Sequence, residues 1–526
     1  MTEPLQRLAD DVFVAPRIAG WPAWWGNVAP LPAAFIVPHQ QIRLMRSYLR
    51  DPALHLRAAS MNATGTAYLR IPADRAAEVA EVAELAEREY AGSIALAADA
   101  AAFAMMLTTE ARGQSLAPFY AMLPASLRGF TELVYDYHGR ASVRLDEGVL
   151  YHSAHYKPAL QQLSFHRLAH DTDRDFFLSG LGLPGDDVTW TVPFDDARVQ
   201  GLFSLDVAPR PLSWIRERLG SAWREELGAF FVEAGPVAAA PPPATGLRIR
   251  YVGHACVLVE HAGRSLIVDP FVSSRPSAKG AAPRTTFADL PARIDVAAIT
   301  HAHPDHFDIE TLLRLLPRIG ELVVPRNHGL LAGDISLAML ARRLGYRNVR
   351  EVGSLEGVPF GDGELLALPF LGEHGDVAHG NKAAWLVRGA GHQILFAADS
   401  AAHDLELYRR LRTSLGVIDT VFMNTEATGS PLSWTYEALF PRMRDRRIEA
   451  DRRCRGSNAE EGAALAQAVG ATRVFNYALG LEPWVSRILG RSSGPSDESN
   501  LLLEKVKEQG KAIATRLEGS TTIDLG

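Results

Sequence analysis

Three histidines and an aspartate fall within six residues of the segment THAHPDHFD, at 300–308. These residues are His301, His303, Asp305 and His306. The segment follows an apolar run typical of a buried strand and precedes a run with helical spacing. In an extended backbone, residues 301 and 303 point to the same side and can share one metal ion, while Asp305 and His306 can reach a second. Because packed cores and solvated turns rarely use three histidines, the spacing predicts a dinuclear metal site.

The composition is that of an ordinary globular chain of several domains. The chain has 526 residues, of which 47% are hydrophobic and 22% are charged, enough for two to four domains. A net charge of −7 argues against nucleic-acid binding. Two cysteines exclude a disulfide scaffold and fit a reducing cytoplasm. We expect no signal peptide and no membrane helix, because the most apolar run, 91–107, is mostly alanine and contains Asp99.

A proline-rich stretch at 233–246 divides the chain and predicts a stiff linker. We therefore expect an N-terminal domain over 1–240 and a C-terminal domain over 246–526. In the first, helical periodicity at 75–107 and alternation at 130–152 indicate a mixed α+β domain. In the second, a meander of strands gives way to alternating strands and helices, which favours an αββα sandwich.

Two local features of the second half are specific enough to check. The run DIETLLRLLPRIG at 308–320 predicts a helix that ends at Gly320. The runs at 383–389 and 392–400 predict a hairpin through the Gly-Ala-Gly turn between them.

The metal motif and its flanks resemble the metallo-β-lactamase superfamily. GHACVLVE at 253–260 and IVDPF, which contains Asp269, resemble the opening strands and the buried aspartate that supports the metal loop. FAADS resembles a later strand end, whose aspartate, here Asp399, bridges two metals in that superfamily. The resemblance covers about 247–430 and implies the sandwich fold for the C-terminal domain.

The histidine content departs from the hydrolases of that superfamily. Those enzymes complete their sites with a histidine between the motif and the bridging aspartate, and with another near the C-terminus. Here no histidine follows His403. Glu373 lies where the first of those ligands would fall, with His374 as its rival, and Glu426 follows a later probable strand. With both glutamates, one metal is held by His301, His303, Glu373 and Asp399, and the other by Asp305, His306, Glu426 and the same Asp399.

Four carboxylates with three histidines suit iron better than zinc, which prefers nitrogen and sulfur donors. This combination resembles the di-iron β-hydroxylases of nonribosomal peptide biosynthesis, of the chloramphenicol-pathway arylalanine β-hydroxylase type. The phrases at 132–153, 458–471 and 477–484 extend the resemblance over nearly the whole chain.

The resemblance implies an O2-dependent monooxygenase with two iron ions. Its substrate would be an aminoacyl group, tethered as a thioester to a nonribosomal peptide synthetase carrier domain and hydroxylated at its β-carbon. It also implies a homodimer formed largely through the N-terminal half. Because the sequence has no flavin motif and too few cysteines for an iron–sulfur cluster, we expect a separate electron-donor protein. The basic run from Arg442 to Arg455 is either a solvated helix face or a contact with an acidic carrier domain.

Two other functions stay open at the level of sequence. A dinuclear zinc or manganese hydrolase would cleave a thioester, lactone or phosphodiester, with His374 in place of Glu373 as a ligand. Alternatively, the metal is structural and the N-terminal half is a docking module. Of the remaining histidines, we expect His254 to hydrogen-bond near the metal site or to play no part there. We expect His379 in a loop or at the surface.

Overall fold

The structure is a computed structural model of the chain. It describes residues 3–61, 68–235, 241–327, 329, 332–426, 429–432, 436–439, 452–490 and 497–525. The middle of the proline-rich linker, 236–240, and most of the basic run, 440–451, therefore lie outside the described residues. The following account concerns the described parts alone.

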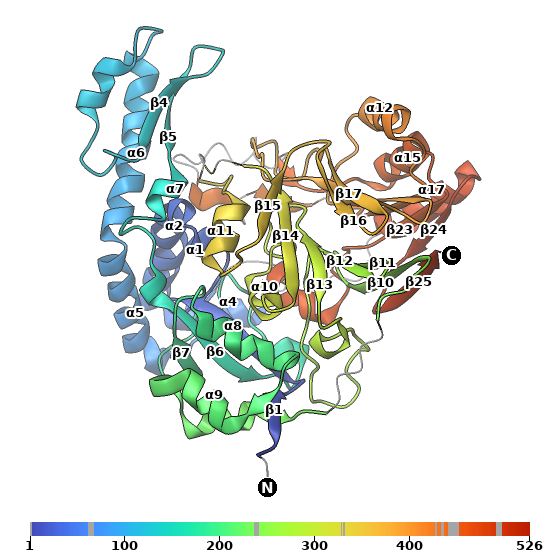
Figure 1. Cartoon of the computed structure of the whole chain (residues 1–526). Helices are drawn as coiled ribbons and strands as arrows, with labels where there is room; N and C mark the ends of the chain where they lie inside the picture. The colour runs from blue at the N-terminus through green and yellow to red at the C-terminus, as the bar shows by residue number, and fades with distance from the viewer. Residues whose placement is uncertain are drawn as a thin grey trace.

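Two seven-stranded sheets form the C-terminal domain (Figure 1). The first has the order β15-β14-β13-β12-β11-β10-β25, with β10 (Leu247–Gly253), β11 (Cys256–His261), β12 (Arg264–Val268), β13 (Ile294–Ala298), β14 (Ile319–Pro325), β15 (Val349–Val352) and β25 (Thr521–Leu525). The second has the order β16-β17-β18-β19-β20-β23-β24, with β16 (Gly357–Phe360), β17 (Gly363–Leu368), β18 (Ala384–Gly389), β19 (His392–Ala398), β20 (Thr420–Met423), β23 (Arg473–Asn476) and β24 (Ile513–Arg516).

The sheets pack face to face, and helices cover their outer faces. Val257 of the first sheet and Trp385 and Phe396 of the second belong to the apolar core between them. The second sheet is covered by α12 (Leu405–Leu415), α15 (Ala459–Val469) and α17 (Asp497–Gln509), and the first by α10 (Ile309–Leu315) and α11 (Leu337–Arg343). The predicted αββα sandwich and the β18–β19 hairpin are thus confirmed.

The N-terminal domain is mixed α+β, as expected. Its main sheet has the order β3-β2-β6-β7, and a smaller sheet the order β8-β1-β9. The strands of the domain are β1 (Leu5–Leu8), β2 (Val12–Ile18), β3 (Trp21–Pro22), β4 (Thr131–Tyr135), β5 (Ala141–Leu145), β6 (Gln161–Arg167), β7 (Val188–Thr191), β8 (Arg210–Pro211) and β9 (Phe231–Glu233). Its α-helices are α1 (Trp25–Val28), α2 (Pro30–Ile36), α3 (Arg43–Arg50), α4 (Pro52–Met61), α5 (Ala76–Glu89), α6 (Ala91–Glu110), α7 (Glu147–Leu150), α8 (Ala197–Phe203) and α9 (Leu212–Leu219).

One continuous apolar core joins the two domains. Trp25 and Phe203 of the N-terminal domain share it with Leu312 of α10 and Leu340 of α11. The N-terminal domain therefore covers the helices that a free sandwich would expose to water. A large hydrophobic interface of this kind holds domains in a fixed arrangement.

Helix α6 is long and apolar enough to span a membrane by length and composition, the one such helix among the residues described. Its side chains Leu96, Phe103 and Leu107 are buried in a cluster that also contains Leu31 of α2 and Leu145 of β5. Core helices pass the same length and composition test. The packing is that of a half-buried helix in a folded domain.

Two sequence predictions of local structure were wrong in detail. The helix expected over 308–320 ends at Leu315, because Pro317 lacks the N–H that would continue it. Gly320 lies instead in β14, where an added Cβ would come 2.9 Å from the carbonyl oxygen of Asp295. The segment 130–152 forms the strands β4 and β5 but ends in the helical turn α7.

Candidate metal centre

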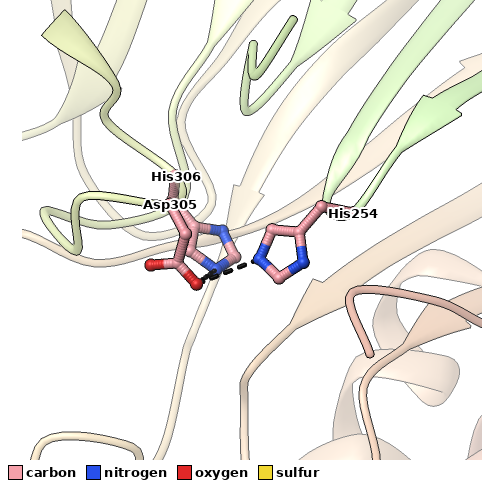
Figure 2. Close-up of side chains that lie close together, drawn as sticks. All are labelled: His254, Asp305 and His306. Carbon is pink, nitrogen blue, oxygen red and sulfur yellow. Dashed lines mark hydrogen bonds and ion pairs between the residues drawn. The ribbon is translucent and has the colours of Figure 1, made fainter. Parts of the chain in front are cut away.

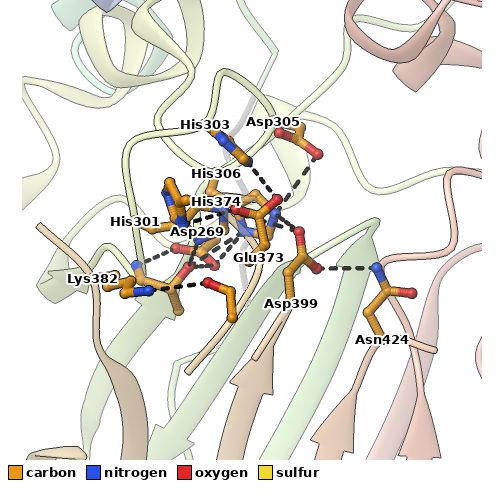
Figure 3. A network of polar contacts seen from close by, with 12 residues as sticks. Asp269, His301, His303, Asp305, His306, Glu373, His374, Lys382, Asp399 and Asn424 are labelled. Carbon is orange, nitrogen blue, oxygen red and sulfur yellow. Dashed lines mark hydrogen bonds and ion pairs between the residues drawn. The ribbon is translucent and has the colours of Figure 1, made fainter. Parts of the chain in front are cut away.

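Loops at the ends of strands carry the candidate ligands to one edge of the sandwich. The loop between β13 and α10 carries the motif 301–306, and Asp308 caps α10 by accepting a hydrogen bond from the backbone N–H of Thr311. Glu373 lies in the loop after β17, and Asp399 directly follows β19. Residues far apart in the sequence therefore meet in one network (Figure 3).

Two of the motif histidines are oriented from behind by Asp269 and Thr300. The Nδ1 atom of His306 lies 2.8 Å from Oδ2 of Asp269. The Nδ1 atom of His301 lies 3.0 Å from Oγ1 of Thr300, whose hydroxyl donates to Asp269 at 2.6 Å. Both Nδ1–H groups are thus engaged, which leaves each Nε2 lone pair free for a metal ion.

Potential ligand atoms gather in overlapping groups, each within 4.8 Å. His301, His303 and Glu373 form one group, and His301, His306 and Asp399 form another. Nδ1 of His303 lies 2.9 Å from Oε1 of Glu373. Oδ2 of Asp399 lies 3.2 Å from Nε2 of His306 and 3.9 Å from Nε2 of His301. Asp399 therefore lies between the two histidines, as a bridging ligand would.

A third group contains His254, Asp305 and His306 (Figure 2). His254 comes from the turn between β10 and β11, and its Nε2 atom lies 3.0 Å from Oδ2 of Asp305. Burial acts to raise the pKa of Asp305, but His306 and His254 hold it below its ordinary value. The Asp305 carboxylate is thus kept ionised and oriented, and His254 is part of the site.

The two glutamates and His374 are placed differently. Glu373 belongs to a ligand group, whereas Glu426 is half-buried and belongs to none of the groups found in the described residues. Burial, together with the carboxylates of Asp399 and Glu373, raises the pKa of Glu426 to about 7. The Nδ1 atom of His374 lies 3.0 Å from Oε2 of Glu373, but His374 joins no group. Six of the seven candidate ligands are therefore brought together.

The loop that carries Glu373 has an unusual backbone. Glu373 has a φ of +71°, a left-handed conformation that non-glycine residues rarely adopt. The loop is held on both sides of this residue. Lys382 donates to the carbonyl oxygen of Gly372 at 3.0 Å, and Arg452 donates to that of Gly375 at 2.9 Å. Such strain persists where the surroundings impose it, most often at functional sites.

Several residues of the site were missed at the level of sequence. The Oη atom of Tyr436 lies 2.8 Å from Nε2 of His303, and Asn424 donates to Oδ1 of Asp399 at 3.1 Å. His379 lies in a loop, as expected, but its side chain is buried and its ring lies 4.3 Å from that of His374. No motif marks Tyr436, Lys382 or His379. Each stands alone in its segment, and only the fold brings it to the site.

The donor atoms fit a pair of iron ions. Nε2 of His301, Nε2 of His306 and Oε2 of Glu373 are buried and have no hydrogen-bond partner among the described residues. Leaving such atoms unsatisfied is costly unless a ligand or ion engages them. A mixed set of imidazoles and carboxylates is the donor set typical of non-haem iron.

Comparisons with known proteins agree with this centre. A family model described as the diiron non-heme beta-hydroxylase N-terminal domain matches residues 7–234, and a beta-lactamase superfamily domain matches 264–475. The 4-amino-L-phenylalanyl-[CmlP-peptidyl-carrier-protein] 3-hydroxylase of Streptomyces venezuelae is 34% identical over 98% of this chain and 99% of its own. A metal-dependent hydrolase of Flavobacterium johnsoniae is 26% identical, but over only 32% of this chain and 69% of its own.

A solved structure resembles the whole chain. The crystal structure of CmlA, a diiron beta-hydroxylase from Streptomyces venezuelae, has a TM-score of 0.92 and 31% sequence identity, and each chain covers 100% of the other. Both domains and their arrangement are therefore shared. The chain belongs to the diiron non-haem β-hydroxylases, enzymes whose cofactor is a pair of iron ions.

Proposed function

We propose that this β-hydroxylase acts on an amino acid bound as a thioester to the carrier domain of a nonribosomal peptide synthetase. The observation that carries the proposal is the full-length identity of 34% with an enzyme whose name specifies a peptidyl carrier protein. Position 3 of the amino acid in that name is the β-carbon. O2 is the co-substrate, and one of its oxygen atoms enters the product.

We assign the seven expected residues as iron ligands. His301, His303 and Glu373 would hold one iron, Asp305, His306 and Glu426 would hold the other, and both would share Asp399. The three groups of close donor atoms support six of these ligands. Glu426 is assigned because its carboxyl lies close enough to Asp399 and Glu373 for both to raise its pKa. When bound, the two irons supply the activation of O2 and the cleavage of the Cβ–H bond.

The residues of the chain itself orient the ligands and exclude water. His301 and His306 are fully buried, and Asp269 and Thr300 fix their ring orientation. The loop of Glu373 is held through hydrogen bonds to the carbonyl oxygens of Gly372 and Gly375, which keeps its carboxylate directed at His303 despite the strained backbone.

Further partners belong to the same proposal. We propose domains over 1–240 and 246–526, a homodimer, a separate electron-donor protein and a cytoplasmic location. The homodimer is supported by the outer side of α6, where Ala95, Ala98, Ala102 and Met105 are exposed. A helix surface of small apolar residues allows close approach of a second helix. Cys256 and Cys454 are both buried, which is consistent with electrons arriving from another protein.

The described end of the basic run is engaged inside the protein. Arg452 donates to the carbonyl oxygen of Gly375, and Arg455 pairs with Glu461 at 2.9 Å. These two arginines support the Glu373 loop and the start of α15. A carrier contact through this run therefore depends on residues 442–451, which lie outside the described residues.

Rapid mixing of the reduced holoenzyme with O2 tests the proposal. We expect slow oxidation with O2 alone or with a free amino acid, and much faster oxidation with the aminoacyl-carrier protein. The product should be heavier by about 16 mass units, one oxygen atom. Equal reactivity with the free and the carrier-bound amino acid contradicts the carrier requirement. Hydrolysis of the thioester by zinc-loaded protein, with no mass gain, supports the hydrolase instead.

A further inference from the structure

His303 is held differently from the other two histidines of the motif. Asp269 and Thr300, which orient His301 and His306, make no recorded hydrogen bond to His303. Its ring lies between two other groups, with Nδ1 at 2.9 Å from Oε1 of Glu373 and Nε2 at 2.8 Å from Oη of Tyr436. Each ring nitrogen therefore has one neighbour: Nδ1 faces the candidate ligand Glu373, and Nε2 faces the hydroxyl of Tyr436.

The chemistry of imidazole fixes which nitrogen carries the proton. A neutral imidazole has one N–H donor and one lone pair, and a metal binds the lone pair. With an iron bound at Nδ1, as the proposed assignment of His303 requires, the N–H lies on Nε2 and donates to the Tyr436 hydroxyl 2.8 Å away. Removing that hydroxyl leaves the buried N–H without a partner and lets the ring turn.

Tyr436 is in turn held by the N-terminal domain. Its ring lies 6.3 Å from that of Trp25 in α1, and both side chains belong to the core that joins the domains. Two residues further on, the carbonyl oxygen of Ala438 lies 3.2 Å from Nδ1 of His39. The short helical turn Glu437–Leu439 also packs on α2. The segment 436–439 therefore connects the N-terminal domain to a candidate iron ligand.

We infer that Tyr436 is a positioning residue of the metal centre, which keeps Nδ1 of His303 directed at the iron, and that the N-terminal domain holds Tyr436 in place. The inference rests on the proposed assignment of His303 as a ligand. It gives the N-terminal domain a direct effect on one iron, since α1 and α2 contact the segment whose hydroxyl orients the imidazole.

Tyr436→Phe is the central test, because it keeps the ring that packs on Trp25 and removes only the hydroxyl. We expect the iron affinity, measured by competition with a chelator, to fall about 10- to 100-fold, as for other outer partners of metal-binding histidines. In the ⁵⁷Fe Mössbauer spectrum, the signal of one iron should change more than that of the other. Wild-type affinity together with a wild-type spectrum overturns the inference.

Tyr346→Phe is the matched control. Tyr346 is also buried, and its hydroxyl donates to the carbonyl oxygen of Leu312 at 2.7 Å, on α10 rather than at a ligand. Its variant should keep the wild-type affinity and spectrum even if it is less stable. If Tyr346→Phe weakens iron binding as much as Tyr436→Phe does, the effect is one of general stability and the inference fails.

Two further variants separate the inference from the ligand assignment on which it rests. His39→Ala removes an exposed side chain of the N-terminal domain, and it should alter the same Mössbauer signal as Tyr436→Phe, but less. An unchanged Mössbauer signal in His39→Ala would show that His39 does not help to hold Tyr436 in place. His303→Ala should lose one iron. If it retains both, the assignment of His303 itself is wrong. If His303→Ala loses one iron but Tyr436→Phe changes neither the iron affinity nor the spectrum, His303 is a ligand and Tyr436 does not position it.

Discussion

The two sides of the metal centre are supported by different parts of the molecule. His306 and His301 are oriented by Asp269 and Thr300, which belong to the same domain and are buried. On the other side, His303 depends on Tyr436, and through it on the N-terminal domain. The first side is fixed once the sandwich has folded. The second is complete only when both domains are in place.

The largest effect is expected from residues that link the groups of ligand atoms. His301 occurs in two of the ligand groups, and Asp399 lies between two histidines. Either His301→Ala or Asp399→Ala should abolish iron loading and activity while leaving the far-UV circular dichroism close to wild type. Metal analysis that finds two irons in either variant refutes the arrangement. So does full activity of the wild-type protein with zinc alone.

A smaller effect is expected when the fixed side loses its support. Asp269→Asn offers an amide in place of the carboxylate that accepts from Nδ1 of His306 and from Thr300. Iron affinity should fall about 10- to 100-fold, with changes in the signals of both irons, because Asp269 supports His306 directly and His301 through Thr300. Asp295→Asn is the control, because its carboxylate accepts from the backbone N–H of Ser265 within the sheet. Identical Mössbauer spectra for the Asp269 and Tyr436 variants would contradict the claim that the two sides of the centre have separate supports.

The smallest effect on the metal centre is expected from Glu147, at a contact between the two domains. Glu147 of α7 is fully buried, and its Oε2 accepts from the backbone N–H of Ser336 at 3.0 Å. Burial raises its pKa from 4.5 to about 8. The folded protein therefore binds a proton that the unfolded chain releases above pH 4.5, and stability falls as the pH rises towards 8.

Glu147→Gln should remove this pH dependence without touching the metal. The wild type loses up to about 1.4 kcal/mol of stability per pH unit in that window through this group, whereas the variant does not. The advantage of the variant in thermal unfolding midpoint should thus be larger at pH 8 than at pH 6, with iron content unchanged. An advantage that shrinks as the pH rises contradicts the assigned sign.

The fixed side is also the side that the sequence predicts well. His301 and His306 lie in one short motif, so one strand-to-helix turn places them together. The same turn carries His303, but the support of His303 by Tyr436 comes from outside the motif. Asp399 was expected from the resemblance of FAADS to the strand end that carries a bridging aspartate in the metallo-β-lactamase superfamily. Strands of both sheets were also predictable from short apolar runs bounded by turn residues. The end of the helix expected over 308–320 was not, because Pro317 ends that helix early.

The other side could not be predicted, because its contacts join distant segments. Tyr436 and His303 are 133 residues apart, and nothing in either local sequence indicates that they meet. His379 was expected in a loop or at the surface, and no motif marks Lys382. In the structure His379 packs against His374, and Lys382 donates to the carbonyl oxygen of Gly372. Glu426 comes from a strand end like Asp399, but it is only half-buried and stays outside the close groups. Strand ends are predictable, whereas the final course of the loops depends on packing.

The most direct test of the metal centre compares two adjacent residues, Glu373 and His374. Both are buried beside His303, but only Glu373 shares a ligand group with it. Glu373→Ala and His374→Ala proteins would be loaded with ⁵⁷Fe and measured by metal analysis and Mössbauer spectroscopy. The account predicts that Glu373→Ala loses or alters one iron, while His374→Ala keeps two irons with a nearly wild-type spectrum. The reverse result would contradict the carboxylate-rich centre and indicate the ligand set of a hydrolase.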